Sequence, residues 1–208
     1  MIYRAKHHFF IYPFFQFYSL WKIKRHFRKV SLIGEFTDKN LPVLLVTNHF
    51  SWWDGFWVMY INLKLFHRKF YFMMLEDQLI KHMFFNKTGA YSIKKGSKSI
   101  VETIDYTVSL LSDGKNLVML FPQGEITSMH ISSVVFEKGI EHIMKKINSK
   151  IHLVFLVNMV DYFSSPKPLL NMYFTEYKGL DYSTEKLQEE YNRFYSECIS
   201  KNLLITDT

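Results

Sequence analysis

The most constraining feature of this sequence is an apolar run that ends abruptly in polar side chains. Residues 41–47 read Leu-Pro-Val-Leu-Leu-Val-Thr and carry no charge, a pattern typical of a strand that is buried on both faces of a sheet. Asn48, His49 and Asp54 follow this run. Because open α/β sheets bind their ligands beyond the C-terminal ends of the strands, we expect the chemistry of this protein to lie where the run ends.

His49 and Asp54 can serve as a pair only if the chain turns between them. On one α-helix, at roughly 100° per residue, their side chains would point about 140° apart. We therefore expect a loop after the strand and a helix that begins near Trp53 or Asp54, with Asn48 bracing the turn. A carboxylate that holds the proton of one imidazole nitrogen leaves the other nitrogen as a general base, so His49 and Asp54 are the candidate catalytic pair.

Other roles for these residues stay open. A histidine among aromatic side chains is often structural. A metal site is not expected, because one His and one Asp supply two ligands where zinc takes three or four. Ser51 is a weak candidate for a nucleophile, because its neighbours do not resemble the Gly-x-Ser-x-Gly turn of the hydrolases that use one.

Segments with strand and helix character alternate along the rest of the chain. Beyond the run at 41–47, strands are predicted at 69–75, 91–93, 116–121, 151–160 and, as an edge strand, 172–175. Helices are predicted at 53–65, 76–85 and 133–147, and a further helix is expected to begin in a capping box of Ser99 and Glu102 and to end at Gly114. Strands separated by helices predict an α/β fold, with a mixed, largely parallel sheet that carries helices on both faces.

A last helix is predicted to begin near Ser183. Its apolar residues recur at helical spacing, so one face is expected to pack on the sheet; this face comprises Leu187, Tyr191, Phe194, Tyr195 and Cys198. Cys198 is the only cysteine, and its place on this face favours packing over reactivity. The chain contains neither a P-loop nor a Gly-x-Gly-x-x-Gly motif.

The N-terminal segment holds the basic excess of the chain. The formal net charge is +7, and residues 1–30 contain seven Lys and Arg residues but no Asp or Glu. Between its basic clusters, residues 9–21 are mostly aromatic, but this run is shorter than the roughly 20 residues that span a bilayer, and Pro13 and Gln16 interrupt it. Aromatic rings favour the headgroup region, and each nearby cation adds about 1 kcal/mol of attraction to anionic lipid. We therefore predict an N-terminal membrane-surface helix in an anchor at 1–33, followed by a globular domain at 34–208.

This segment also allows other interpretations. A secretory signal is disfavoured, because a basic run follows the apolar centre in place of a small-residue cleavage site. Aromatic and basic residues also suit single-stranded nucleic acid, and a helix that packs in the core is a further alternative. The membrane surface is the preferred partner, and nucleic acid is not expected to be one.

Three short blocks in register resemble those of the glycerolipid (lysophosphatidate-type) acyltransferase family. The first is Asn48-His49-x-x-x-x-Asp54, which follows an apolar strand as it does in that family. The second is similar to the family's Gly-x-Phe-x-x-x-Arg block, and the third to its Phe-Pro-Glu-Gly-Thr-Arg block; they read Gly89-Ala90-Tyr91-Ser92-Ile93-Lys94-Lys95 and Phe121-Pro122-Gln123-Gly124-Glu125. Together the blocks cover about residues 40–160, and the resemblance identifies 34–208 as an acyltransferase domain.

The resemblance implies transfer of a fatty acyl group from acyl-CoA or acyl carrier protein, as co-substrate, to a hydroxyl of a lysophospholipid or related lipid, with no further cofactor. The second and third blocks would hold the acceptor. From these blocks and the turn that follows the second, the expected substrate-binding residues are Asn48, Gly89, Lys94, Lys95, Ser97, Phe121, Pro122, Gln123, Gly124 and Glu125. Backbone N–H groups near Gly124 and Glu125 are expected to be free for a developing oxyanion. The expected location is peripheral or monotopic, on the cytoplasmic face of the inner (plasma) membrane.

This chain departs from the family pattern at several positions. Lys95 stands where the family has Arg, Gln123 where it has Glu, and Glu125 and Ile126 where it has Thr and Arg. A lysine offers a point charge in place of a bidentate fork, so these departures weaken the case for lysophosphatidate as the acceptor more than the case for acyl transfer. A glycolipid, amino-lipid or carotenoid-glycoside hydroxyl is an alternative acceptor, and a non-catalytic lipid-binding protein is an alternative function.

Overall fold

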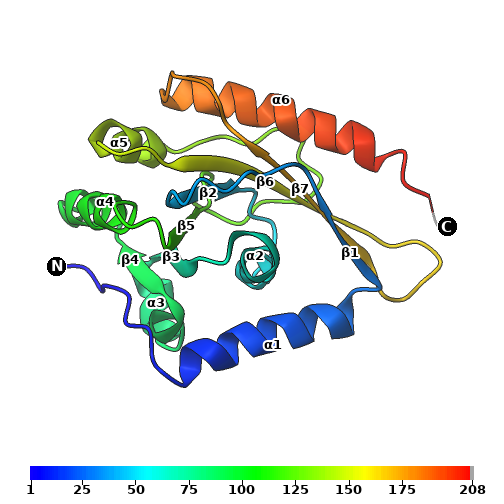
Figure 1. Cartoon of the computed structure of the whole chain (residues 1–208), viewed down its shortest axis with the longest axis horizontal. Coiled ribbons are helices and arrows are strands. Elements are labelled where there is room, and N and C mark those ends of the chain that lie inside the picture. The colour runs from blue at the N-terminus through cyan, green and yellow to red at the C-terminus, as the bar shows by residue number, and fades with distance from the viewer. Residues whose placement is uncertain (207–208) are drawn as a thin grey trace.

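The computed structural model describes residues 1–206, and within them the strands form one seven-stranded sheet (Figure 1). The strands are β1 (Lys29–Ile33), β2 (Val43–Thr47), β3 (Lys69–Leu75), β4 (Ala90–Ile93), β5 (Asn116–Leu120), β6 (His152–Asp161) and β7 (Leu169–Glu176). Their order across the sheet is β1-β7-β6-β2-β5-β3-β4. The β6–β7 pair is antiparallel and every other pair is parallel, so the predicted largely parallel α/β sheet is confirmed.

Helices cover both faces of this sheet (Figure 1). One face carries α1 (Ile11–His26), α2 (Asp54–Ile61) with its π-helical continuation η1 (Asn62–Phe66), α3 (Glu76–Lys81) and the 3-10 helix η2 (Phe85–Thr88). The other carries α4 (Ser99–Leu110), α5 (Gly139–Lys146) and α6 (Thr184–Asn202). The central strand β2 contributes to the hydrophobic cores on both faces of the sheet, because Val43 and Leu45 point to the first face and Leu44 and Val46 to the second.

The N-terminal segment is part of this packing. Phe15, Ser19 and Ile23 bury one side of α1, which lies against α2 (Figure 1). Ahead of α1, the chain runs beside β4, where the Ser92 N–H donates to the Tyr3 carbonyl at 2.9 Å. The boundary expected after residue 33 coincides with the end of β1, and the segments on both sides of it share one core. Membrane binding by the first segment stays a prediction.

Two predicted helix beginnings are wrong for reasons that lie outside the local sequence. The capping box does not form: Lys98 is the N-cap residue of α4, and the Glu102 carboxylate lies 3.3 Å from the N-terminal amine of Met1. The helix expected at 133–147 begins only at Gly139. Val134 and Phe136 stay outside it, because their N–H groups donate to the side-chain oxygens of Asn192 and Gln188 on α6.

Other predicted bounds also change. The helix at 53–65 becomes π-helical at Asn62, the helix at 76–85 ends at Lys81, and α4 ends at Leu110, ahead of Gly114. The predicted edge strand at 172–175 is β7, which lies inside the sheet between β6 and β1. It is not an edge because residues 29–33, part of the predicted anchor, form β1 and pair with it. The last helix and its packing face are confirmed.

Candidate active site

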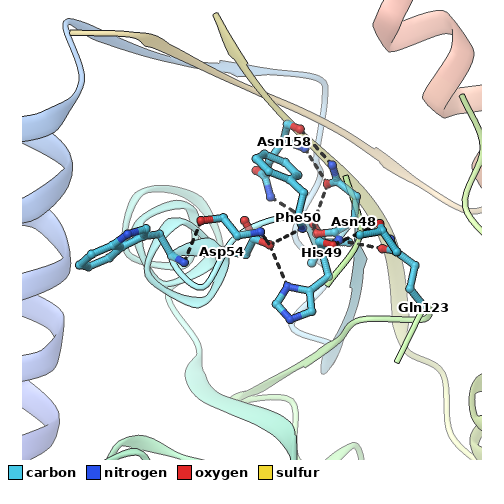
Figure 2. Close-up of polar contacts among 10 residues, drawn as sticks. Asn48, His49, Phe50, Asp54, Gln123 and Asn158 are labelled. Atoms are coloured by element: carbon cyan, nitrogen blue, oxygen red, sulfur yellow. Dashed lines mark hydrogen bonds and ion pairs between the residues drawn. The ribbon is translucent and has the colours of Figure 1, made fainter. Parts of the chain in front are cut away.

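The structure brings His49 and Asp54 into direct contact. β2 ends at Thr47, a short loop carries His49, and α2 begins at Asp54. This turn places His49 Nδ1 2.8 Å from Asp54 Oδ2, and Figure 2 shows the imidazole and the carboxylate facing each other. The same carboxylate oxygen accepts the N–H groups of Phe50 and Ser51, each at 2.9 Å. Asp54 therefore closes the turn that presents His49.

Asp54 is a buried acid whose proton affinity is altered by its surroundings. Its side chain has no exposed surface, and its Oδ1 atom has no hydrogen-bond partner among the described residues. Burial raises the pKa of the Asp54 carboxyl, while the hydrogen bonds from His49, Ser51 and Phe50 oppose that shift. The chain keeps an acid at a position where a charge is costly, and this pattern is common at catalytic sites.

His49 is held in one plane and keeps one nitrogen available. The Phe121 ring stacks on the imidazole, with centroids 3.7 Å apart and planes at 13°. The His49 side chain retains 19% of its accessible surface. Within residues 1–206, Nδ1 is bonded to Asp54 and no residue bonds to Nε2. An imidazole in this state can accept a proton through Nε2 while the carboxylate stabilises the imidazolium.

Asn48 ties the end of β2 to the neighbouring strand. Its side-chain Nδ2 donates to the Asn158 carbonyl at 3.0 Å, and its Oδ1 accepts the Asn158 N–H at 2.9 Å. The Asn158 side chain in turn donates to Thr47 Oγ1 at 3.2 Å. Figure 2 shows this pairing beside His49. Both polar ends of the Asn48 amide are thus used inside the protein, at the point where the loop with His49 begins.

Gln123 connects the third block to the first. It is buried, and its Oε1 accepts the His49 N–H at 2.7 Å (Figure 2). Its Nε2 donates to Thr127 Oγ1, and the Thr127 N–H donates to the His49 carbonyl at 2.9 Å. Substrate binding by Gln123 stays a prediction, but both polar atoms of its side chain already have partners within the protein.

The two lysines of the second block are paired with acids. Lys95 Nζ lies 3.0 Å from Glu137 Oε1 and close over Gly124, where an added Cβ would be 2.8 Å from the ammonium nitrogen. Lys94 Nζ lies 3.4 Å from Glu76 Oε1. The second and third blocks therefore meet in space, as the resemblance implies, and each lysine already has a negatively charged neighbour.

The remaining residues predicted to bind substrate take part in backbone packing or backbone hydrogen bonds. Gly89 has φ +115°, and a Cβ there would lie 2.1 Å from the Phe70 carbonyl oxygen, so the position needs glycine to pass β3. Ser97 Oγ accepts the Ser99 N–H at 3.2 Å at the start of α4. The Pro122 carbonyl accepts the Glu137 N–H at 2.8 Å. Ligand contacts by these residues stay predictions.

One detail of the third block is corrected. The Gly124 N–H, expected to be free for an oxyanion, donates to the Phe121 carbonyl at 3.1 Å and closes the turn after β5. Glu125 is exposed, and a role for its N–H group stays a prediction. Gly124 adopts φ +67°, a conformation that favours glycine.

Sequence reasoning missed Asn158, which bonds to Asn48, and Thr127, which bonds to His49. Asn158 stands out as an amide within the apolar run of β6, and that break in the pattern could have identified it. Thr127 gave no signal, because its contact with His49 depends on how the loop after β5 folds back.

Two surface cavities of about 570 and 420 Å³ lie away from the candidate active site, since their lining residues do not include His49 or Asp54. A fatty chain bound at His49 would lie outside both.

Together, the fold and the site define an α/β protein with a histidine–carboxylate pair beyond the C-terminal end of a central parallel strand, the arrangement of a general-base site. Residues 28–157, more than half of the chain, match the family model described as acyltransferase. The protein belongs to this family, which comprises the glycerolipid acyltransferases. A search of individual curated proteins gave no match.

Proposed function

We propose that this protein transfers a fatty acyl group from an acyl thioester to a hydroxyl of a lipid at a membrane surface. The observation that carries the proposal is the state of His49, whose Nδ1 lies 2.8 Å from buried Asp54 and whose Nε2 is bonded to none of residues 1–206. An alcohol needs a base at neutral pH, because its own pKa is far higher. His49 is that base, and Asp54 orients it.

The proposed reaction proceeds without an acyl-enzyme. As the acceptor oxygen attacks the thioester carbonyl, its proton passes to His49 Nε2, and the Asp54 carboxylate stabilises the imidazolium. The tetrahedral intermediate then collapses, the carbon–sulfur bond breaks, and the thiolate of CoA or acyl carrier protein takes the proton back from His49. The products are an ester and a free thiol. Binding both substrates side by side supplies much of the rate gain.

The acceptor is a lysophospholipid or a related lipid with a free hydroxyl. The pairs Lys95–Glu137 and Lys94–Glu76 bear on this choice, because a phosphate bound there would compete with two carboxylates. All four of these side chains keep some contact with solvent, and exposed ion pairs are weak, so either lysine could exchange its partner for a phosphate. The pairing of both lysines with acids also suits a glycolipid, amino-lipid or carotenoid-glycoside hydroxyl. The acceptor panel must therefore include these lipids.

Exposed aromatic side chains on α1 support the membrane part of the proposal. Phe14, Phe17 and Trp21 each keep at least 44% of their accessible surface, although the opposite side of α1 is buried in the core. Trp53, one residue ahead of α2, lies beneath Lys22 of α1, with 4.9 Å between the ammonium nitrogen and the ring centroid. Exposed rings beside cations suit the headgroup region of an anionic bilayer. Among the described residues, no helix has the length and hydropathy needed to cross a membrane.

The catalytic part is tested by an acyl-transfer assay with purified protein. Labelled acyl-CoA and acyl carrier protein are offered with lysophosphatidate, other lysophospholipids and glycolipids, and His49→Ala is measured beside the wild type. We expect transfer to at least one acceptor and a loss of about 10³-fold in the variant, since a general base contributes 10²–10⁴. A variant that folds and keeps the wild-type rate would remove His49 from the mechanism.

Membrane binding is tested by substitution, because deleting residues 1–30 would also remove Phe15 and Ile23 from the core. The variant Phe14→Gln/Phe17→Gln/Trp21→Gln is compared with the wild type in flotation with phosphatidylglycerol vesicles. We expect the variant to bind at least about tenfold more weakly. The matched control Val101→Gln/Leu180→Gln changes exposed apolar residues elsewhere and should float like the wild type. Equal flotation of all three proteins would contradict the anchor.

A further inference from the structure

A closed ring of hydrogen bonds surrounds the backbone of His49. It joins His49 to two residues of the loop that follows β5, Gln123 and Thr127. We infer that Gln123 and Thr127 are positioning residues, which fix the backbone of His49 so that its imidazole meets Asp54 and presents Nε2 to the acceptor. The inference rests on the proposed role of His49 as the base.

The ring uses both polar groups of the His49 backbone. The His49 N–H donates to Gln123 Oε1 at 2.7 Å, and the His49 carbonyl accepts the Thr127 N–H at 2.9 Å. The hydrogen bond from Gln123 Nε2 to Thr127 Oγ1 closes the ring. With its donor and its acceptor both held by one loop, the peptide groups on either side of His49 cannot rotate independently. The direction of the Cα–Cβ bond of His49 is therefore fixed by residues that do not touch its ring.

Two independent supports thus converge on the imidazole. The loop after β5 holds the His49 backbone through Gln123 and Thr127 and sets the plane of the ring through Phe121, which stacks on it at 3.7 Å. The start of α2 supplies the carboxylate of Asp54. A misplacement of 1 Å in a reacting group can cost about 10²-fold in rate, so a loosened backbone should lower turnover even if the pair still forms part of the time.

The ring also explains why a neutral amide suits position 123. An amide offers an acceptor to the His49 N–H and a donor to the Thr127 hydroxyl at the same time. A carboxylate would have acceptors only, so the Thr127 hydroxyl would have to turn and donate to it. It would also place a negative charge beside the imidazole, which favours the imidazolium. Replacing the amide by a carboxylate would therefore change both the hydrogen bonding of the ring and the charge beside the imidazole.

The positioning role is tested first with Thr127→Val and Thr127→Ser in the transfer assay. Valine keeps the volume but removes the acceptor for Gln123, whereas serine retains the hydroxyl. We expect kcat to fall about tenfold in Thr127→Val with an unchanged KM, because orientation of the base matters in the transition state, and we expect Thr127→Ser to stay within about threefold of the wild type. Thr107→Val is the matched control: it removes a buried hydroxyl on α4, bonded to Tyr91, and should leave kcat unchanged.

The second measurement is the pH profile of Gln123→Glu. The added charge should move the acid limb of kcat/KM to higher pH by about one unit. NMR titration of labelled histidine, with His49 assigned by its loss in His49→Ala, gives a readout that needs no turnover. We expect the titration midpoint of the His49 ring to rise in Gln123→Glu, to fall in Thr127→Val as the contact with Asp54 loosens, and to stay unchanged in Thr127→Ser and Thr107→Val.

These results separate the inference from the proposed function. A wild type with no His49-dependent transfer would overturn the proposed function, and the NMR midpoints would still decide whether the ring positions His49. An active wild type whose kcat and midpoint are unaffected by Thr127→Val would overturn the positioning role alone. Equal losses in Thr127→Val and Thr107→Val would also overturn it, because they would report general destabilisation.

Discussion

Within residues 1–206, two histidines, His49 and His152, are each hydrogen-bonded to a carboxylate, and they lie at opposite ends of the same central strands. His49 lies beyond the C-terminal end of β2, with Nδ1 2.8 Å from Asp54 Oδ2. His152 begins β6 and is in register with Val43, the first residue of β2, so it lies at the N-terminal end; its Nδ1 is 2.5 Å from Glu176 Oε1. Judged by this contact alone, the two pairs are equivalent.

They differ in what happens at the other ring nitrogen. His152 has no exposed surface, and its Nε2 accepts the Lys39 N–H at 3.2 Å. Phe36 packs against its ring, and Arg68 pairs with the neighbouring Asp38. His49 keeps part of its surface, and its Nε2 has no partner within residues 1–206. A histidine–carboxylate pair can therefore either stabilise the fold or supply a candidate base. The two cases differ in whether the second ring nitrogen is free to contact a substrate.

The largest expected effect comes from Asp54→Asn, which should separate catalysis from stability. We expect transfer to fall by about 10³-fold, or about 4 kcal/mol in the barrier, because the amide neither fixes the required tautomer nor stabilises the imidazolium. Burial raises the pKa of the Asp54 carboxyl in the folded protein. The free energy of unfolding of the wild type therefore falls as pH rises through that pKa and the buried carboxyl becomes charged. The variant should therefore unfold at or above the wild-type temperature at pH 7.

The advantage of Asp54→Asn in thermal unfolding should shrink at acid pH, where the wild-type carboxyl is protonated. Thermal melts across pH, with activity measured on the same samples, provide the check. A variant that is both inactive and much less stable at pH 7 would show that Asp54 acts mainly as a structural residue, like Glu176.

An intermediate effect is expected for His152→Ala, which should lower the stability of the protein and leave its turnover nearly unchanged. The substitution leaves a cavity and removes the partner of Glu176 and of the Lys39 N–H, and it should lower the free energy of unfolding by about 2–4 kcal/mol. Turnover per folded molecule should stay within about twofold of the wild type. Urea unfolding gives the first quantity and an assay corrected for the folded fraction gives the second. Folded protein with greatly reduced turnover would end the distinction between the two pairs.

The smallest effect concerns His7, a partly buried histidine that has no carboxylate partner among residues 1–206. Its Nε2 faces the Phe70 carbonyl at 2.9 Å, and burial lowers its pKa to about 4. The unfolded chain takes up a proton near pH 6.5 that the folded chain accepts only near pH 4, so stability is lost as pH falls across this window. His7→Gln should remove that loss. After allowance for its partial exposure, the difference is about 1 kcal/mol, and unfolding curves at pH 7 and pH 5 will show whether the slope depends on His7.

Prediction from sequence succeeded where the signal is local. The apolar runs gave β2 and β3, and the spacing of His49 and Asp54 required the turn that the structure contains. It failed where a distant segment decides the outcome. Residues 29–33 fall within the segment predicted to be the anchor, yet they complete the sheet by pairing with β7. Val134 and Phe136 have helical spacing with the residues after them, but side chains of α6 hold them outside the helix.

The sequence by itself determined the family, the largely parallel sheet and the His49–Asp54 pair, because each depends on residue types at fixed spacing along one stretch of chain. Tertiary structure alone decided which histidine keeps an open nitrogen, and it alone brought Thr127 to His49 and Asn158 to Asn48. Those outcomes depend on hydrogen bonds between segments far apart in the chain, and no local pattern encodes such partners.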